Sequence, residues 1–201
     1  MRRLTATGTA ILLAGAFGGC SLGGLLGGGG KPPTTLVTLM PEAPAPAQLA
    51  RTAAAGQAVT ISIPTVPKEL TAVRVPVQLT PTNIQYVANL QLVDTPDRLF
   101  QGLLAETVRR TTNRVVLDPA QATLDPGVTV TGELQRFGYD ASTGQVVVTY
   151  DAALSSAGGN GLQTRRFTGM APADGTGPSV GPALNRAANQ VALDVAKWIG
   201  G

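Results

Sequence analysis

The sequence contains no histidine and a single cysteine, Cys20. Without histidine, a Ser-His-Asp triad is impossible, and the commonest general base and a frequent transition-metal ligand are missing. One cysteine cannot form an internal disulfide, so an exported domain of this sequence must be held together by packing. None of the 12 acidic residues lies in a pattern that demands acid–base chemistry. These absences predict neither a metal site nor a catalytic site, and they disfavour an enzyme.

Charged and aromatic residues are also scarce, at 13% and 4% of the chain. The formal net charge is only +3, and the sequence has no basic stripe with interleaved aromatic residues, so nucleic acid is not a predicted partner. Glycine-rich stretches at 23–30 and 158–161 lack the lysine and the following helix of a phosphate-binding loop. We interpret the first as a tether and the second as a turn.

The N-terminal residues have the layout of a secretory signal peptide. Arg2 and Arg3 precede an almost uncharged apolar run at 9–17, which is too short to span a bilayer permanently. Small residues then lead to Cys20, and the arrangement resembles a bacterial lipobox, whose cysteine thiol is acylated and becomes the new N-terminus. We interpret residues 1–19 as a lipoprotein signal peptide. The alternative is an ordinary signal peptide followed by a free thiol.

Residues 20–57 read as a linker. Four glycines at 27–30 have little propensity for regular structure, and residues 31–57 are rich in proline and alanine. A strand at 35–40 is the one element expected within this stretch. As a coil, the linker would have an average reach of about 30 Å.

We expect the folded domain to occupy residues 58–201. Apolar residues alternate with polar ones at 59–63 and 73–79, which predicts half-buried strands, and Pro76 suggests an edge strand or a bulge. Two short extended pieces follow at 84–87 and 89–93. Thr95 and Pro96 then form a helix start, and apolar residues at helical spacing continue to Val108.

The second half of this domain predicts a β-meander and a closing helix. Strands at 115–117, 128–134, 145–154 and 162–170 are separated by turn sequences, and Gly132 suggests a bulge or a close backbone approach. An apolar stripe over 180–199 predicts the last helix. The expected fold is α+β, with an antiparallel sheet and two amphipathic helices packed on one of its faces.

The remaining polar and aromatic candidates have structural explanations. Capping and turn formation account for four acids, Asp94, Asp97, Asp118 and Asp125. Arg165 and Arg166 should point to opposite faces of a strand, so that one of them is freely solvated. A cross-strand ion pair is the expected contact there, and an acidic partner is the alternative. Asn185 and Asn189 are neighbours on the last helix and should hydrogen-bond a strand end. Tyr86 and Trp198 should serve packing.

Several segments, taken in order, resemble the ABC-type transport auxiliary lipoprotein family. The likeness covers roughly residues 35–199, and Leu92 stands where that family usually has tryptophan. The segments that carry the resemblance are 73–77, 84–87, 89–99, 132–137, 165–167 and 189–198.

The resemblance implies a lipoprotein of the Gram-negative envelope that assists an MCE-type lipid transport system. Diacylglycerol and a fatty acyl chain on Cys20 would form the anchor, with no other cofactor. Ser21 replaces the aspartate that retains such lipoproteins at the inner membrane, and so implies the periplasmic face of the outer membrane. The expected function is non-enzymatic docking of a periplasm-spanning MCE-domain protein, and a homo-oligomeric ring would suit such a role. A periplasmic carrier that holds an acyl chain in a cavity is the alternative.

Overall fold

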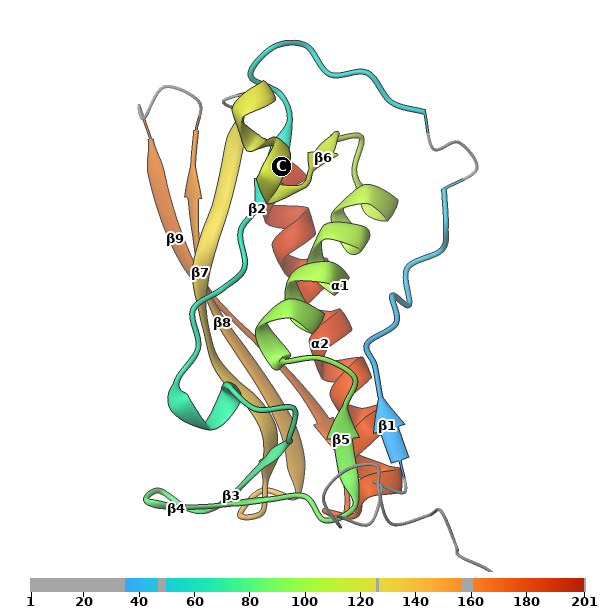
Figure 1. Cartoon of the computed structure of the whole chain (residues 1–201), viewed down its shortest axis with the longest axis vertical. Coiled ribbons are helices and arrows are strands. Elements are labelled where there is room, and N and C mark those ends of the chain that lie inside the picture. The colour runs from blue at the N-terminus through green and yellow to red at the C-terminus, as the bar shows by residue number, and fades with distance from the viewer. Residues whose placement is uncertain (1–34, 47–49, 126, 157–160, 201) are drawn as a thin grey trace, which may run out of the picture. The chain divides into compact units, whose positions relative to one another are not determined.

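The computed structural model describes residues 35–46, 50–125, 127–156 and 161–200. Three long strands, β7 (Val128–Asp140), β8 (Gln145–Ser155) and β9 (Leu162–Pro172), form an antiparallel meander (Figure 1). The turn between β7 and β8 is closed by a bond from the Gly144 N–H to the Asp140 carbonyl (2.9 Å), and Gly144 adopts a φ of 67°. This meander and its first hairpin confirm the sequence prediction.

Shorter strands extend the sheet on the other side of β7. Strands β2 (Val59–Ile61) and β3 (Pro76–Thr80) each pair with β7 in parallel, β6 (Val116–Leu117) joins β2 in parallel, and β4 (Asn83–Tyr86) joins β3 antiparallel. The α+β class is therefore as predicted, but the sheet is mixed rather than antiparallel. Period-two patterning identifies strands without identifying their partners, and these partners lie far apart in the sequence.

Pro76 lies in a strand with neighbours on both sides, rather than in an edge strand. Because it is the first residue of β3, and the pairing of β3 with β7 begins at Val77, its missing N–H costs no ladder bond. The irregularity in the β3–β4 pairing falls instead between Gln78 and Thr80. Two short 3₁₀ helices, η2 (Lys68–Leu70) and η3 (Pro119–Leu124), complete the connections on this side.

Two helices lie on the same side of the sheet (Figure 1). Helix α1 (Pro96–Thr111) begins as predicted, with Thr95 as N-cap and Pro96 in the first turn, and ends with Arg109 and Arg110 in its last turn. Helix α2 (Gly177–Gly200) covers β8 and β9, and α1 packs against α2. The rings of Phe100 on α1 and Tyr150 on β8 meet with centroids 5.1 Å apart.

The core fills the space between the sheet and the helices. On β8, the predicted inward row of Val146, Val148, Tyr150 and Ala152 is buried, and Leu154 packs at its margin. The Tyr150 hydroxyl donates to the carbonyl of Thr131 (3.0 Å), and burial raises the Tyr150 pKa above its ordinary value. Apolar burial of this kind stabilises the fold in proportion to the area removed from water.

At two glycines the backbone has no room for a side chain. A Cβ on Gly132 would lie 2.2 Å from the Asp151 carbonyl oxygen, which confirms the close approach expected there. The β-bulge itself falls between Leu134 and Arg136. A Cβ on Gly169 would lie 2.2 Å from the Ala187 carbonyl oxygen of α2, so the absence of a side chain lets β9 and α2 approach closely.

The first described residues already belong to the fold. Strand β1 (Thr35–Val37) pairs in parallel with β5 (Leu90–Leu92), and the pair forms a two-stranded ribbon separate from the main sheet. Residues 38–46, here called the strap, follow β1 and lie against the helices. Part of the stretch expected as linker is therefore packed on the domain, ahead of the expected start at Ala58.

Candidate interaction surfaces

The acidic residues singled out in the sequence have structural roles. Asp118 caps η3, because its Oδ1 accepts from the Ala120 N–H (2.9 Å), and Asp94 Oδ1 accepts from the Thr95 N–H (2.7 Å). Asp97 lies in the first turn of α1, where the positive end of the helix dipole favours a carboxylate. Asp118 and Asp94 therefore follow the prediction, whereas the buried Oδ1 atom of Asp97 has no hydrogen-bond partner among the described residues.

Asp125 does more than form a turn. Its carboxylate accepts from the Gly56 N–H (2.7 Å) and the Ala58 N–H (3.0 Å), so it joins the loop after η3 to the segment that leads into β2. The Asp-Pro dipeptide at 125–126 indicated a turn and gave no sign of this long-range contact. Among the residues that the structure describes, no group of three or more histidine, cysteine, aspartate or glutamate side chains could hold a metal ion.

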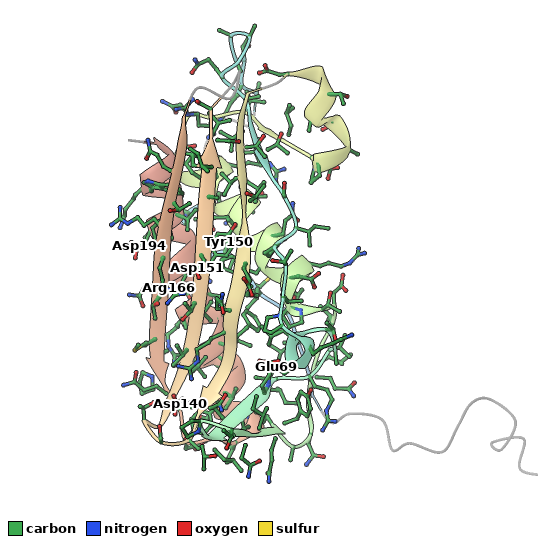
Figure 2. All side chains as sticks on the ribbon, turned by 90° about the vertical axis from the view of Figure 1, so that its left-hand side faces the viewer. Glu69, Asp140, Tyr150, Asp151, Arg166 and Asp194 are labelled. Carbon is green, nitrogen blue, oxygen red and sulfur yellow. The ribbon has the colours of Figure 1, made fainter. Side chains whose placement is uncertain are left out.

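Arg166 and Asp151 form the predicted cross-strand ion pair. They face each other in the β8–β9 register, and two hydrogen bonds of 2.6 Å join the guanidinium to the carboxylate on the sheet face opposite the helices (Figure 2). The guanidinium lowers the pKa of Asp151 below its ordinary value of 3.8.

Both arginines are exposed, so the expectation that only one would be solvated is wrong. Arg165 lies on the helix side of the sheet, with its guanidinium 5.2 Å from the centre of the Phe167 ring. The Phe167 ring in turn contacts Trp198, close to the end of α2. Arg165 precedes Phe167 by two residues in β9 and, unlike Phe167, is exposed.

This ion pair predicts a small, acid-sensitive contribution to stability. Because folding lowers the Asp151 pKa, the carboxylate stabilises the fold above pH 3.8, and this contribution disappears as the pH falls through the lowered pKa. Replacement Arg166→Gln should therefore lower Tm slightly at pH 7, and the difference from wild type should vanish in acid. Thermal melts at several pH values would show it. Arg165→Gln is the matched control, and a pH-independent Arg166→Gln difference would contradict the assignment.

Asn185 and Asn189 clamp the strap onto α2. The N–H groups of Met40 and Glu42 donate to the Oδ1 atoms of Asn185 and Asn189, both at 2.8 Å. Asn189 Nδ2 donates to the Met40 carbonyl (2.9 Å), and Asn185 Nδ2 donates to the Glu42 carboxylate (3.0 Å). The asparagines therefore bond the strap, three and five residues after β1 ends at Val37, rather than the strand end that was expected.

Helix α1 and the residues after the strap add further attachments. Arg110 Nη1 donates to the Ala43 carbonyl (2.9 Å), and its Nε pairs with Glu106 (2.8 Å). Arg51 Nη1 donates to the carbonyls of Thr112 and Arg114, beyond the end of α1. These arginines donate hydrogen bonds to backbone carbonyls that no helix or strand pairs. Together with the asparagines of α2, they hold the N-terminal segment along both helices.

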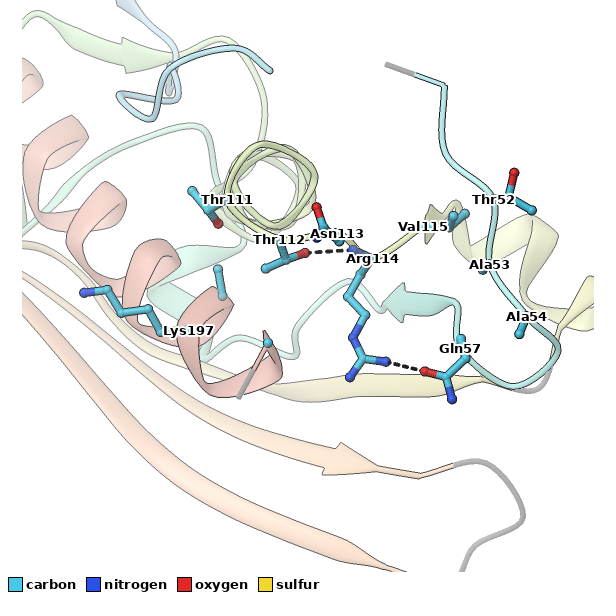
Figure 3. Close-up of a pocket in the computed structure, with 12 residues that line it drawn as sticks. Thr52, Ala53, Ala54, Gln57, Thr111, Thr112, Asn113, Arg114, Val115 and Lys197 are labelled. Carbon is cyan, nitrogen blue, oxygen red and sulfur yellow. Dashed lines mark hydrogen bonds between the residues drawn. The ribbon is translucent and has the colours of Figure 1, made fainter. Parts of the chain in front are cut away.

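An open pocket of about 610 Å³ lies where α1 and α2 end (Figure 3). Residues 52–57 form one wall, and the segment from Thr111 to Val115 forms another. Arg114 crosses between them and donates to Gln57 Oε1 (3.1 Å). None of the described residues in the lining is acidic, so the pocket offers a polar contact surface and no carboxylate for general acid–base catalysis.

The two aromatic candidates serve packing, as predicted. Trp198 packs on Phe167 with ring centroids 5.6 Å apart. Tyr86 lies under the guanidinium of Arg74, 4.2 Å from the ring centre, and its hydroxyl donates to the Glu69 carbonyl (3.4 Å). Neither ring offers a free platform for a ligand.

Strand β9 forms an open edge of the sheet, a feature that the sequence pattern did not reveal. The Ala173 N–H donates to the Gly144 carbonyl, and the Ser156 N–H donates to the Gly161 carbonyl, both at 3.1 Å. With the β8–β9 register, these bonds show that the odd-numbered residues of β9 direct their backbone N–H and C=O groups toward β8. The even-numbered residues direct their backbone groups outward. Met170 N–H donates to Gln190 Oε1 (3.3 Å), whereas the outward N–H groups of Leu162, Thr164, Arg166 and Thr168 have no partner among the described residues.

The predicted lipidation and sorting residues, Cys20 and Ser21, lie outside the described residues. Within the described part of the chain, no helix is both long enough and apolar enough to cross a membrane.

Comparison with known proteins supplies the family. The profile of the ABC-type transport auxiliary lipoprotein component matches residues 38–196. A crystal structure of a Xanthomonas campestris protein of family DUF330 superposes with a TM-score of 0.64 at 16% identity, covering 84% of this chain and 92% of that one. A second crystal structure, of an uncharacterized protein, has a TM-score of 0.59 at 16% identity and covers 76% of this chain and 95% of its own. No curated protein matches.

The two structural matches establish the fold, and the profile match runs from the strap to the last turns of α2, which is most of the chain. By this match, the chain belongs to the ABC-type transport auxiliary lipoprotein component family.

Proposed function

We propose that this protein is an outer-membrane lipoprotein that docks the periplasm-spanning MCE-domain protein of an ABC-type lipid transport system. The observation that carries the proposal is the family match over residues 38–196, since it includes nearly the whole folded domain. The family description as an auxiliary component fits a docking role better than a catalytic one. The histidine-free composition and the structural roles of the acids agree with a non-enzyme.

The anchor in this proposal is Cys20, which carries diacylglycerol and a fatty acyl chain. It is the only cysteine of the chain, and it follows an apolar run of signal-peptide length. Each buried methylene of an acyl chain contributes about 0.8 kcal/mol to membrane binding, so several chains hold the protein durably. Ser21 directs the protein to the outer membrane, with its domain in the periplasm.

The edge of β9 is the proposed docking site. Four outward N–H groups in an 11-residue strand can pair with an added strand of a partner, a recognition mode in which backbone hydrogen bonds supply affinity. The exposed arginines on this strand, one already paired with Asp151, would also discourage non-specific pairing of the edge. A docking role is favoured over an acyl-chain carrier because buried side chains, including Phe100, Tyr150 and Val191, occupy the space between sheet and helices.

The proposal is tested by crosslinking the full-length protein in native membranes and identifying the captured proteins by mass spectrometry. We expect an MCE-domain protein, crosslinked through β9. A matched pair of variants, Thr164→Pro and Gln163→Pro, separates edge pairing from general damage. The first removes an outward N–H and should abolish capture with the fold retained, whereas the second removes a bond to β8 and should destabilise the sheet. Capture unaffected by Thr164→Pro would contradict docking at this edge.

Loss of the lipid anchor gives a separate prediction. Cys20→Ser should abolish incorporation of a labelled fatty acid. The variant should leave the outer-membrane fraction and be recovered as soluble periplasmic protein or as precursor that retains its signal peptide. Fractionation with metabolic labelling would measure both. A membrane-bound, labelled Cys20→Ser protein with intact lipid transport would disprove the assignment of the anchor.

A further inference from the structure

The ribbon formed by β1 and β5 exposes apolar side chains on its outer face. Side chains along β1 and the start of the strap alternate, so Val37 and Leu39 face the domain while Leu36 and Met40 face outward. Leu36 is 61% exposed and Met40 is 62% exposed, whereas Leu39 is only 8% exposed. The outward apolar residues are therefore set by the extended backbone and have no packing role in the core.

The pairing with β5 adds a third apolar side chain to this face. Leu36 is opposite Gln91 and Val37 is opposite Leu92, and the Val93 N–H continues the ladder by donating to the Val37 carbonyl (3.0 Å). Val93 therefore lies beside Thr38, between Leu36 and Met40, and it is 53% exposed. We call Leu36, Met40 and Val93 the ribbon patch.

The patch is held rigidly. The amides of Asn185 and Asn189 fix the strap directly after β1, and the Val37 side chain packs against the backbone of α2 at Gly181, where a Cβ would approach it to 3.1 Å. Its acidic neighbours are also engaged within the domain. Glu42 accepts from Asn185 Nδ2 and Asp94 accepts from the Thr95 N–H. The surface offered to a partner is therefore apolar and not electrostatic.

Covalent connectivity makes the ribbon the part of the domain nearest to the anchor along the chain. Fifteen residue steps join Cys20 to Thr35, so the first residue of β1 lies within about 50 Å of the acylated residue at full extension. The opposite end of α2 is remote from the ribbon, because the nineteen residue steps from Gly181 to Gly200 span about 29 Å.

We propose that the ribbon patch rests on the bilayer surface, with Leu36, Met40 and Val93 at the boundary between head groups and acyl chains. This inference rests on the proposed acylation of Cys20. These three apolar side chains form a far smaller surface than the roughly 20–30 residues on each side of a standard protein interface. A tethered bilayer is always present at high effective concentration, so a weak apolar contact is enough to orient the domain. The β9 edge then remains free for a partner protein.

Methionine oxidation tests the proposal in the wild-type chain. Met40 is in the patch, whereas Met170 lies on the sheet and is 55% exposed, which makes it an internal reference. Acylated protein would be reconstituted in vesicles of phosphatidylethanolamine and phosphatidylglycerol and treated with hydrogen peroxide. Mass spectrometry would then follow sulfoxide formation at each residue. On vesicles, Met40 should oxidise severalfold more slowly than Met170, and in the unanchored protein the two rates should be similar.

Controls separate this inference from the proposed anchor. Protein that lacks acylation can be coupled through the Cys20 thiol to a maleimide lipid, which preserves the tether length and keeps the patch testable even if natural acylation fails. The double variant Leu36→Ser and Val93→Ser should remove the protection of Met40. Equal oxidation of both methionines on vesicles would overturn the proposal. Protection that appears only after addition of a membrane protein extract would also overturn it, in favour of a protein-binding patch.

Discussion

Replacement Asn189→Ala should release the strap from α2 and lower the free energy of unfolding by about 2–4 kcal/mol. The Asn189 side chain is buried, with 7% exposure, and it bonds the N–H of Glu42 and the carbonyl of Met40. Both groups would lose their partner, and each unsatisfied polar group costs about 1–3 kcal/mol. The better helix propensity of alanine would offset only about 0.7 kcal/mol.

Chemical denaturation would measure the loss of stability, and limited chymotrypsin digestion would report cleavage near Leu39 and Met40. Gln190→Ala is the matched control, because the neighbouring amide is exposed and accepts a single bond of 3.3 Å. It should change stability little. If Asn189→Ala matched this control in both measurements, the strap would not depend on the asparagine clamp.

Replacement Gly169→Ala should be the second strongly disruptive change, with a loss of about 3 kcal/mol. The added Cβ would lie 2.2 Å from the carbonyl oxygen of Ala187 and 3.1 Å from a methyl carbon of Val191. Both contacts belong to α2, so the helix would have to move away from β9. Backbone atoms cannot yield by changing rotamer, and the cost therefore falls on the packing between the helix and the sheet.

Gly102→Ala provides the matched comparison. A Cβ at this position in α1 meets no atom within 4 Å, so the same substitution should stabilise the protein by about 0.5–1 kcal/mol through helix propensity. Thermal and denaturant unfolding of the two variants would give effects of opposite sign. A Gly169→Ala protein as stable as wild type would show that α2 and β9 can separate without cost.

The two large effects bear on different proposed contact surfaces. Loss of the strap would lengthen the free path between the anchor and the first fixed residue, and it would also release the ribbon patch. Asn189→Ala should therefore reduce the protection of Met40 on vesicles as well as stability. Gly169→Ala acts instead on β9, the proposed docking edge.

Local patterns predicted most elements of this fold. The alternation at 145–154 correctly gave the buried face of β8, and the Thr95-Pro96 start and apolar spacing gave α1 to within one or two residues. Each of these features depends on neighbours that are close in sequence or on one helix face, where 3.6- and 2-residue periods determine which side chains lie together.

Features that depend on distant pairing were not available from the sequence. Nothing local indicates that β2 and β3 join β7 in parallel, that Asp125 holds the turn before β2, or that the proline- and alanine-rich segment packs on the helices. The open edge of β9 follows from which strand lies last in the sheet, not from its composition.

By itself, the sequence determined the element types, the absence of histidine- and disulfide-based chemistry, and the position of the only cysteine relative to the signal-like segment. The tertiary structure alone decided which strand edge stays open and which apolar side chains remain on the surface. Leu36, Met40 and Val93 show the physical reason. The pairing of β1 with β5 turns one row of alternating side chains inward, so the other row must face outward, whatever its hydrophobicity.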